Sequence, residues 1–421
     1  MNLINKKYKI LMLSDHALST SGVGCQSRFL IDGLIKKGCW SVRQFGAALK
    51  HENYDTVFVN EDFIIKPIDG FGNRELILST LVSEKPDLLL IFTDPRFFTW
   101  LYEIEDEVRQ VCPIAYWHVW DNLPTPIFNK PIYEATDLIN CHSYLTYEMV
   151  SAIYPEKTHF IPHALPDQLF YPLSKSEINI YRQQILGNKK DDFIVFWVNR
   201  NAKRKRSSDV IWAWSEFVKK AKEINGENFK ATLLMHTDPN DVEGPNLLAV
   251  SEHFGVSNSI IWSNNRVEFE KMNVLHNISD CCLNISFAEG FGLATLEAMQ
   301  CAKPIIATKT GGLTRQVVDH RDGTENGVAL NVDFRTLVGS QILPYIYEDY
   351  SSIETISNAI LKLYLMNKDD REKLGKKAFD YVKSEFNYQK TVDLWHESLL
   401  KLIEEYKFKV NNRWSIQEVI N

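Results

Sequence analysis

Short apolar runs alternate with amphipathic segments along most of the chain, and this alternation indicates β-α units arranged around parallel sheets. In the first half, the apolar runs predict strands at Tyr8–Ser14, Ser41–Phe45, Leu88–Phe92, Pro113–His118 and Leu138–Cys141. The segments between them predict helices that include Gln26–Lys37 and Thr99–Gln110. We therefore expect a doubly wound α/β arrangement in this half, with helices on both faces of a parallel sheet.

The same alternation starts again in the second half of the chain. Strands are predicted at Phe193–Val198, Ala231–His236, Ser259–Trp262, Cys281–Ile285 and Pro304–Thr308. Helices are predicted near Ser207–Ile224, Glu268–Ile278 and Leu293–Cys301. After Ile353 the pattern is almost wholly helical, and its last stretch keeps helical spacing at Val392, Leu394, Trp395, Leu399, Leu402 and Ile403.

The two patterns are separated by Ala164–Glu177, a stretch rich in Pro, polar and turn-forming residues. We interpret it as the passage between two domains, 1–172 and 173–399, with about 400–421 completing the first domain. In open α/β sheets, ligands bind at the carboxyl ends of the strands. A cleft between two such domains is therefore the expected place for a ligand.

Composition restricts the classes of function. The 421 residues, 45% hydrophobic and 24% charged, are ordinary for a globular protein of two or three domains. Seven scattered cysteines without a CxxC pair predict neither a disulfide framework nor a zinc site and favour a cytoplasmic location. The sequence shows no signal peptide and no run of about 18 apolar residues, so we expect no membrane insertion. Residues 1–172 hold 15 Lys and Arg against 21 Asp and Glu, a balance of −6 that disfavours nucleic acid as a partner.

The stretch Phe287–Met299, FAEGFGLATLEAM, has the composition of a ligand site. It follows a buried strand and leads into a helix that is expected to begin close to Gly292. The first-turn N–H groups of that helix would attract an anion, and glycines would let a phosphate approach the backbone. At about 1.5 Å per residue, Glu297 would lie roughly 7 Å along the helix, with Glu289 in the loop on the other side. This layout suits a ligand with a central diphosphate and a hydroxyl-rich group at each end.

For an arbitrary pair of acids at this spacing, a capping acid and a solvated acid would be the simpler interpretation. Here the surrounding residues resemble the E-x7-E element of retaining nucleotide-sugar glycosyltransferases of the two-domain type, glycosyltransferase family 4 above all. The residues that carry the likeness are Ser286, Glu289 to Gly292, Leu296 to Met299, Lys303-Pro304 and Thr310 to Gly312. The resemblance implies that Glu289 lies beside the donor sugar, that Glu297 binds the ribose, and that Gly290, Phe291, Gly292 and Leu293 offer backbone amides to the phosphates.

A basic loop, FWVNRNAKRKRSSD, follows the first strand of the second half. A solvated loop or a nucleic-acid patch would be the usual interpretation of such a run. In the resembled family, an Arg and a Lys about five residues later neutralise the donor diphosphate at this point, and Arg200 and Lys205 match that spacing. The departures are Asn199, where the family usually has Gly, and the additional cations Lys203, Arg204 and Arg206.

Two features of the first half match the resembled family. A glycine loop containing Gly22 and Gly24 follows the first strand. A plain tight turn is the alternative interpretation of this loop, because Ser27 occupies the position of the third glycine in a dinucleotide-binding fingerprint. The family implies that this loop faces the donor phosphates or the acceptor. His118 ends a predicted strand and matches an active-site histidine that would bind a sugar hydroxyl, whereas a packed core histidine is the alternative. His163 resembles the family's hinge segment and is interpreted as structural.

Two further positions complete the predicted donor site. His236 ends a predicted strand on the ligand side, and Val267 belongs to a loop that corresponds to the one beside the nucleotide base in the family. His236 and Asp238 lack further partners at metal-ligand spacing, and the chain contains no Asp-x-Asp. We therefore expect no metal and no other cofactor.

The resemblance implies the fold and the function: two Rossmann-like doubly wound domains facing a cleft (GT-B architecture), C-terminal helices that cross back to the first domain, and a retaining, metal-independent glycosyltransferase. The partners would be a nucleotide sugar and a glycan, lipid-linked, protein or small-molecule acceptor. Three alternatives remain. They are an epimerase or phosphorylase of the same fold, a DNA binder or base-glycosylating enzyme that uses residues 203–206, and a non-catalytic donor-binding subunit.

Overall fold

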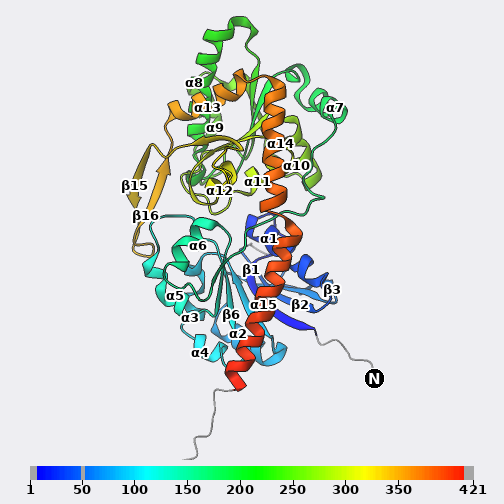
Figure 1. Ribbon diagram of the computed structural model, residues 1–421, viewed down its shortest axis with the longest axis vertical. Helices are drawn as coiled ribbons and strands as arrows, with labels where there is room; N and C mark the ends of the chain where they lie inside the picture. The colour runs from blue at the N-terminus through cyan, green and yellow to red at the C-terminus, as the bar shows by residue number, and fades with distance from the viewer. Residues whose placement is uncertain (1–6, 49–52, 412–421) are drawn as a thin grey trace, which may run out of the picture. The chain divides into compact units, whose positions relative to one another are not determined.

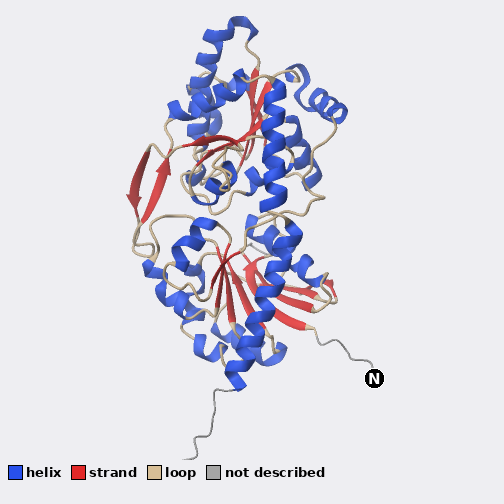
Figure 2. Cartoon of the chain, in the orientation of Figure 1, coloured by secondary structure: helices blue, strands red, loops and turns tan. Residues whose placement is uncertain are grey.

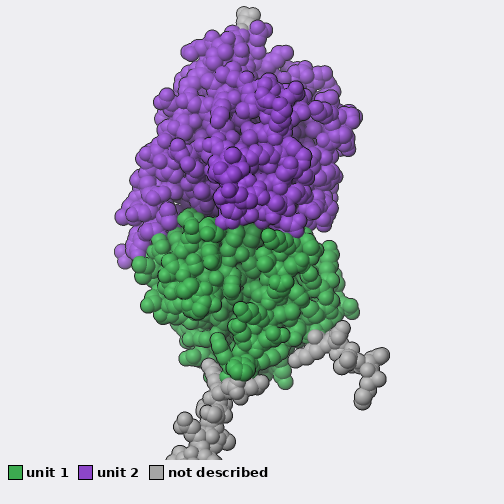
Figure 3. Space-filling view, in the orientation of Figure 1, with its two compact units in different colours: residues 1–120, 125–163, 388–421 green, residues 121–124, 164–387 purple. Residues whose placement is uncertain are grey.

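The computed structural model describes residues 7–48 and 53–411. The chain forms two compact units, coloured separately in Figure 3. Unit 1 comprises residues 1–120, 125–163 and 388–421, and unit 2 comprises residues 121–124 and 164–387.

These bounds differ from the predicted division at 172/173 and at about 400. Residues 164–173 belong to unit 2 because their backbone is tied to it: the N–H groups of Tyr171 and Leu173 donate to side-chain oxygens of two asparagines, Asn273 and Asn277. The return to unit 1 begins earlier than expected, at Tyr388. Residues 412–421, the end of the segment predicted to complete the first domain, lie outside the described residues.

Unit 1 is built on one eight-stranded sheet (Figure 1). Its strands are β1 (Tyr8–Asp15), β2 (Trp40–Ala47), β3 (Val57–Asn60), β4 (Phe63–Pro67), β5 (Leu88–Phe92), β6 (Ile114–His118), β7 (Leu138–Cys141) and β8 (Thr158–Phe160). Their order is β3-β4-β2-β1-β5-β6-β7-β8, and only the β3–β4 pair is antiparallel. The five strands predicted from apolar runs are confirmed, whereas β3, β4 and β8 were not predicted. Burial explains the difference for β3, where exposed and half-buried positions alternate.

The helices of unit 1 cover both faces of this sheet. They are α1 (Gly22–Ile35), α2 (Arg74–Glu84), α3 (Thr99–Tyr102), α4 (Glu105–Val108), α5 (Lys130–Glu134), α6 (Tyr144–Ser151) and α15 (Tyr388–Asn411). Alternate residues of β1 enter different cores, because side chains of a strand point to opposite faces: Ile10 lies in one core and Leu11 in the other. The first of these cores includes Trp395 and Leu399 of α15, so the return of the last helix to the first domain is confirmed.

One predicted helix is wrong. Thr99–Gln110 was expected to be continuous, but the helical backbone is interrupted between α3 and α4. Ile104 takes φ −119° and ψ 21°, outside the helical region, and its side chain is 1% exposed within the core. Leu101, Ile104 and Val108 are all buried in one core. Their i, i+3, i+7 spacing also fits one face of a continuous helix, so the pattern of apolar residues does not reveal the interruption.

Unit 2 contains a six-stranded parallel sheet. Its strands are β9 (Phe193–Val198), β10 (Ala231–His236), β11 (Ile260–Ser263), β12 (Cys281–Asn284), β13 (Ile305–Thr308) and β14 (Gly327–Leu330). The order is β11-β10-β9-β12-β13-β14, the doubly wound order that reverses between β9 and β12. All five strands predicted for this half are confirmed. A separate antiparallel hairpin, β15 (Phe334–Val338) and β16 (Ile346–Tyr350), was not predicted, because β15 is largely exposed and carries no buried pattern.

Helices lie on both faces of the second sheet (Figure 2). They are α7 (Lys175–Leu186), α8 (Ser207–Asn225), α9 (Leu247–His253), α10 (Phe269–Ile278), α11 (Leu293–Gln300), α12 (Thr314–Val317), α13 (Ile353–Leu365) and α14 (Lys368–Glu385). In β9, Val195 packs into a core with α8 and α13, and Ile194 packs into a second core with α7 and α10. The predicted α/β class is confirmed. No helix among residues 7–48 and 53–411 has the length and apolar character needed to cross a membrane.

Candidate active site

The loop between β12 and α11 is shaped by a left-handed glycine. Gly292 has φ +93° and ψ 68°, a conformation that only glycine adopts without strain, and α11 begins at the next residue. Gly292 has no side chain with which to cap the helix, so no side-chain acceptor takes the first-turn N–H groups of α11. The predicted helix start is confirmed, and the arrangement is suited to binding an anion.

A second loop, after β13, packs directly against this one. The N–H of Gly312 donates to the carbonyl oxygen of Glu289 over 3.0 Å. Gly311 has φ +48°, and a Cβ at this position would overlap that carbonyl oxygen. The amide of Gln316 donates to the carbonyl oxygen of Phe291 over 2.7 Å. The backbone of residues 289–292 is therefore held in place by contacts from the neighbouring strand-to-helix connection.

Glu289 is buried between two cations. Lys205 forms a hydrogen-bonded ion pair with its Oε2, and Arg204 Nη1 lies 3.2 Å from the same atom. The hydroxyl of Ser286 donates to Oε2 over 3.1 Å. Burial alone would raise the pKa of Glu289, but the charges of Lys205 and Arg204 outweigh it and lower the pKa to about 2. Glu289 is therefore an ionised acceptor at neutral pH.

The pKa values of the two cations, Lys205 and Arg204, shift in opposite directions. Burial lowers the pKa of Lys205 below its usual value, and the carboxylate of Glu289 partly offsets this effect. The pKa of Arg204 is raised, because Glu289 and Asp121 more than compensate for burial. Arg204 is further fixed by donating to the carbonyl oxygen of Ala288 over 2.6 Å. The group thus holds two cations and two carboxylates, because Asp121 Oδ2 lies 4.0 Å from Arg204 Nη1 in addition to the contacts of Glu289. The two cations are the charges that a phosphate could share with these acids.

Glu297 lies inside α11 and is oriented by a histidine of α10. Nε2 of His276 is 2.9 Å from Oε2 of Glu297, and because a carboxylate only accepts, this nitrogen is the donor. The imidazole is 1% exposed and packs edge-on against Phe170 and Phe196, with ring centroids 5.8 and 4.9 Å away. A rigid, buried donor therefore fixes one oxygen of Glu297 and leaves the other for a ligand.

The structure does not bring Arg200 to Glu289. Its guanidinium donates to Asp241 over 2.8 Å and lies 3.0 Å from Glu243, and the side chain is 58% exposed. These acids raise the pKa of Arg200, and the hydrogen bond that it donates to Asp241 contributes most. Of the predicted Arg and Lys pair, only Lys205 adjoins Glu289 in this conformation, and the additional cation beside it is Arg204.

His236 and Val267 were predicted for the nucleotide end of the donor site, and the structure shows their local surroundings. His236 ends β10, and its Nδ1 is 2.8 Å from the hydroxyl of Ser263. Burial and the neighbouring His276 lower the pKa of His236, so its ring is neutral at physiological pH. Val267 is half-buried and packs on the core that includes α10. Their contacts with a nucleotide stay predictions.

Gly22 and Gly24, which were predicted to form a glycine loop, are part of a helix. Gly22 is the first residue of α1, and Ser21 caps the helix by accepting from the N–H of Gly24 over 2.9 Å. The hydroxyl of Ser21 also donates to Asp15 at the end of β1 over 2.6 Å. Burial raises the pKa of Asp15 above its usual value. The helix therefore begins earlier than the predicted Gln26, and its first turn adjoins a buried acid.

His118 is fully buried at the end of β6, with 0% of its surface exposed. Its Nε2 is 2.8 Å from the hydroxyl of Tyr133, and burial together with His142 lowers its pKa well below the usual value. His142 and His163 follow β7 and β8, and their rings are 5.0 Å apart. The predicted contact of His118 with a sugar hydroxyl stays a prediction, since its ring has no accessible surface in this conformation.

Three contributors to this site were missed by the sequence reasoning: Arg204, His276 and Gln316. Arg204 was visible only as one member of a basic run, and the short 3-10 turn Lys203–Lys205 decides which members face Glu289. His276 and Gln316 lie on other helices and carry no local signal. Among residues 7–48 and 53–411, no group of three His, Cys, Asp or Glu side chains could hold a metal ion; the expectation of metal independence stays a prediction.

Other proteins of known structure share this architecture. The chain is similar to sucrose-phosphate synthase from Thermosynechococcus elongatus, with a TM-score of 0.71 at 18% identity over 95% of this chain and 100% of the other. It is also similar to Anabaena HepE in complex with UDP-glucose, with a TM-score of 0.67 at 16% identity over 93% and 99% of the two chains. The fold is that of the GT-B glycosyltransferases. The model of the family Glycosyl transferases group 1 matches residues 180–331.

The similarity to curated proteins is partial. Trehalose synthase of Thermococcus litoralis is 24% identical over 241 residues, which are 54% of this chain and 50% of that protein. N-acetyl-alpha-D-glucosaminyl L-malate synthase of Bacillus anthracis is 25% identical over 202 residues, 44% and 49% of the two chains. The chain thus spans about half the length of these relatives.

Proposed function

We propose that this protein is a retaining glycosyltransferase that moves a sugar from a nucleotide sugar to an acceptor hydroxyl without a metal ion. The observation that carries the proposal is the cluster of Glu289, Lys205 and Arg204 at the uncapped start of α11. It combines fixed positive charge, an anion-binding helix terminus and an ionised hydrogen-bond acceptor within a few residues. The group 1 domain that contains the cluster supports the same conclusion.

The donor would lie along the start of α11. The diphosphate would accept hydrogen bonds from the backbone of Gly290 to Leu293 and face Lys205, while Glu289 would accept from hydroxyls of the sugar. Glu297 lies in the second turn of α11, about 7 Å from the helix start by the helix rise, a distance that suits a ribose joined to the diphosphate. Its free oxygen would accept from a ribose hydroxyl while His276 holds the other.

The charge that develops in the reaction is on the leaving nucleoside diphosphate. As the bond between the anomeric carbon and the phosphate oxygen breaks, that oxygen gains negative charge, which Lys205 and the helix amides stabilise. The acceptor hydroxyl forms the new bond from the same face and transfers its proton to the departing phosphate oxygen, so the anomeric configuration is retained. We expect Arg200 to join the phosphate only after leaving Asp241 and Glu243.

The acceptor side is proposed for unit 1, at the carboxyl ends of its strands, where Asp15 and His118 lie. A glycan, a lipid-linked glycan, a protein or a small molecule fits this proposal equally. For the donor, the structurally similar Anabaena HepE has been solved in complexes with UDP and with UDP-glucose. UDP-sugars are therefore the first donors to test, before GDP-sugars and ADP-sugars.

The basic run 203–206 does not form an exposed stripe that would favour nucleic acid. Arg204 and Lys205 face Glu289, and Arg206 is buried, donating to Asp209 and to the carbonyl oxygen of Ser351. Lys203 is the member of this run that is exposed. The contacts therefore support a donor phosphate over a DNA backbone as the ligand of this run.

The test is nucleoside diphosphate release from a panel of UDP-, GDP- and ADP-sugars, with and without EDTA. We expect release with one nucleotide class, an unchanged rate in EDTA, and a product whose anomeric configuration, measured by proton NMR, equals that of the donor. Lys205→Met should abolish most of the release. An inverted product would overturn the retaining mechanism, loss of activity in EDTA would overturn metal independence, and a rate unaffected by Lys205→Met would overturn the site.

A further inference from the structure

A cavity of about 150 Å³ lies in unit 2 away from the cluster around Glu289. Its wall includes Ser279 and Asp280, which precede β12, and Lys303 and Pro304, which precede β13. Residues that precede parallel strands lie at the amino edge of a sheet, whereas the Glu289 loop follows β12 at the carboxyl edge. The cavity is therefore on the opposite side of the sheet from the proposed donor site.

The cavity has an excess of positive charge. Five basic side chains line it, Lys175, Arg182, Lys303, Lys368 and Arg371, against two acidic ones, Asp280 and Glu372. This is unusual in a chain whose net charge is −7. At the rim, Lys175 is paired with Glu372 over 2.9 Å and is 79% exposed, so that pair is largely solvated. Lys368 is exposed as well, and Arg182, Lys303 and Arg371 are the half-buried cations of the wall.

The inner wall places three cations around one carboxylate. Arg182 lies 2.6 Å from Asp280 Oδ2, and Arg371 lies 3.7 Å from its Oδ1, with side chains 17% and 15% exposed. The same Oδ2 accepts from the N–H of Ile194 over 2.8 Å. The single charge of Asp280 is thus shared between two guanidinium groups and a backbone amide. It cannot also neutralise the third cation, Lys303.

The ammonium group of Lys303 has no hydrogen bond or ion pair with any residue in 7–48 or 53–411, although the residue is half-buried in the wall of the cavity. Its backbone N–H donates to the carbonyl oxygen of Ala298. Burial lowers the pKa of Lys303, Asp280 opposes that effect, and Arg182 adds to it. Removing an ammonium group from water costs free energy unless an anion compensates for it. The first turns of α7 and α14 also border the cavity, and their helix dipoles add further positive potential.

We propose that this cavity is a second anion site of unit 2, which binds a phosphoryl dianion between Lys303, Arg182 and Arg371. The volume admits a small anion and is below the roughly 300 Å³ of sites for larger organic ligands. Two negative charges would balance the two that Asp280 leaves uncompensated. The phosphoryl group belongs either to free inorganic phosphate or to a phosphomonoester whose remainder extends past the rim. The inference concerns binding alone and does not depend on the proposed transferase activity.

The first measurement is phosphate binding to the full chain by thermal shift and by calorimetry, at ionic strength matched with sodium chloride. We expect about 10 mM inorganic phosphate to raise Tm by roughly 2–3 °C through mass action. Lys303→Met should remove this rise and weaken binding at least about tenfold, because a charge-assisted hydrogen bond is lost. Lys303→Arg should keep the rise.

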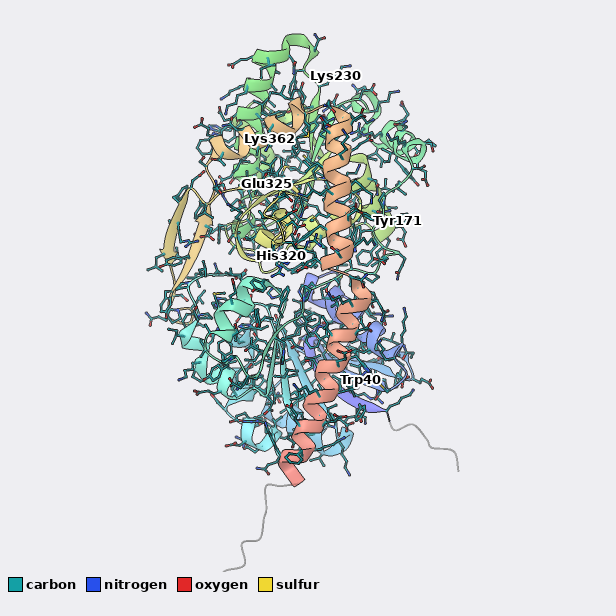
Figure 4. All side chains as sticks on the ribbon, viewed as in Figure 1. Trp40, Tyr171, Lys230, His320, Glu325 and Lys362 are labelled. Atoms are coloured by element: carbon teal, nitrogen blue, oxygen red, sulfur yellow. The ribbon has the colours of Figure 1, made fainter. Side chains whose placement is uncertain are left out.

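Three controls separate this site from other effects. Lys362→Met removes a surface cation of α13, labelled in Figure 4, and should behave as the parent. Lys205→Met disrupts the proposed donor site and should keep the phosphate-dependent rise. In phosphate-free buffer, Lys303→Met should melt at the parent's Tm or above it, because the substitution relieves repulsion between Lys303 and the two arginines.

The outcomes distinguish the two sources of the phosphoryl group and the failure of the proposal. A rise with inorganic phosphate but not with glycerol phosphate assigns the site to the free anion, and a rise with both assigns it to phosphoryl groups in general. A rise that survives in Lys303→Met, or that disappears in Lys205→Met, overturns the proposal. So does a clearly lower Tm of Lys303→Met without phosphate, which would show that Lys303 serves as a structural partner of Asp280.

Discussion

The carboxyl edges of the two sheets differ in their electrostatics. In unit 2, the edge presents an ionised Glu289, two cations and an uncapped helix start. In unit 1, the corresponding edge presents His118, whose pKa burial lowers, and Asp15, whose pKa burial raises. Charge is stabilised on the first edge by partners and suppressed on the second by burial.

This contrast indicates a division of chemical labour. Under the proposed function, a leaving diphosphate would need the fixed charge that unit 2 presents, whereas an acceptor hydroxyl would need neutral groups that accept or donate single hydrogen bonds. A charged edge in both units would have favoured two anionic ligands. Variants that remove charge from unit 2 should therefore change the reaction far more than variants of the buried residues in unit 1.

The largest effect is expected for Glu289→Gln. The amide keeps the shape but removes the charge that pairs with Lys205 and Arg204, so kcat/KM for the donor should fall at least about 100-fold. The same change leaves two cations without their carboxylate and should lower the free energy of unfolding by roughly 3 kcal/mol. Steady-state kinetics and thermal unfolding check both effects. Glu252→Gln, which replaces an exposed acid of α9, is the matched control. If kcat/KM of Glu289→Gln fell by less than about threefold, the role assigned to Glu289 would be contradicted.

The next largest effect is expected for Lys205→Met, which removes the cation nearest to Glu289. We expect kcat/KM to fall about 30- to 100-fold, with kcat falling more than KM rises, because the leaving charge develops in the transition state. Folding should be retained, since Arg204 still faces Glu289 at 3.2 Å. Lys203→Met, the exposed neighbour in the same run, is the control. Equal losses in the two variants would show that only the general charge of the run matters.

The sequence predicted the regular framework well where burial is complete. β9 and β10 begin and end at the residues expected from their apolar runs, because both faces of these strands are covered. β15 was missed for the converse reason, since an exposed strand carries no such run. The continuous helix at Thr99–Gln110 was wrong because the buried Ile104 leaves the helical backbone, which periodicity cannot detect.

The candidate site likewise contains features that the sequence predicts and features that it does not. Glu289, Gly292 and Glu297 are positioned by one loop and one helix, so their spacing in the sequence predicts the local arrangement. The direction of a long side chain is a different problem. Arg200 and Arg204 are four residues apart in one basic run, and only the fold shows that Asp241 binds the first while Ala288 and Glu289 bind the second. Contacts between distant segments, such as His276 with Glu297, leave no trace in local spacing.

A smaller effect is expected for His276→Phe. The ring keeps its packing between Phe170 and Phe196 but no longer donates to Glu297, whose carboxylate then loses its fixed orientation. We expect KM for the nucleotide sugar to rise about tenfold with kcat nearly unchanged, because ribose binding is the same in the ground and transition states. His276→Gln retains a donor and should recover part of the loss. A fall in kcat with KM unchanged would instead place His276 in the chemical step.

The smallest effect concerns unit 1 and is a pH dependence. Because burial lowers the pKa of His118 well below 6.5, the unfolded chain binds a proton there that the folded chain does not. The stability contributed by the neutral ring is therefore complete above about pH 6.5 and decreases as pH falls below it, by up to about 1.4 kcal/mol per pH unit. His118→Phe removes this titration, so the decrease in Tm between about pH 7 and pH 5.5 should become smaller than in the parent. His253→Phe, at an exposed position of α9, should leave the pH dependence unchanged. If His118→Phe also leaves it unchanged, the ring titrates normally in the folded chain, and the carboxyl edge of unit 1 would carry charge as the edge of unit 2 does.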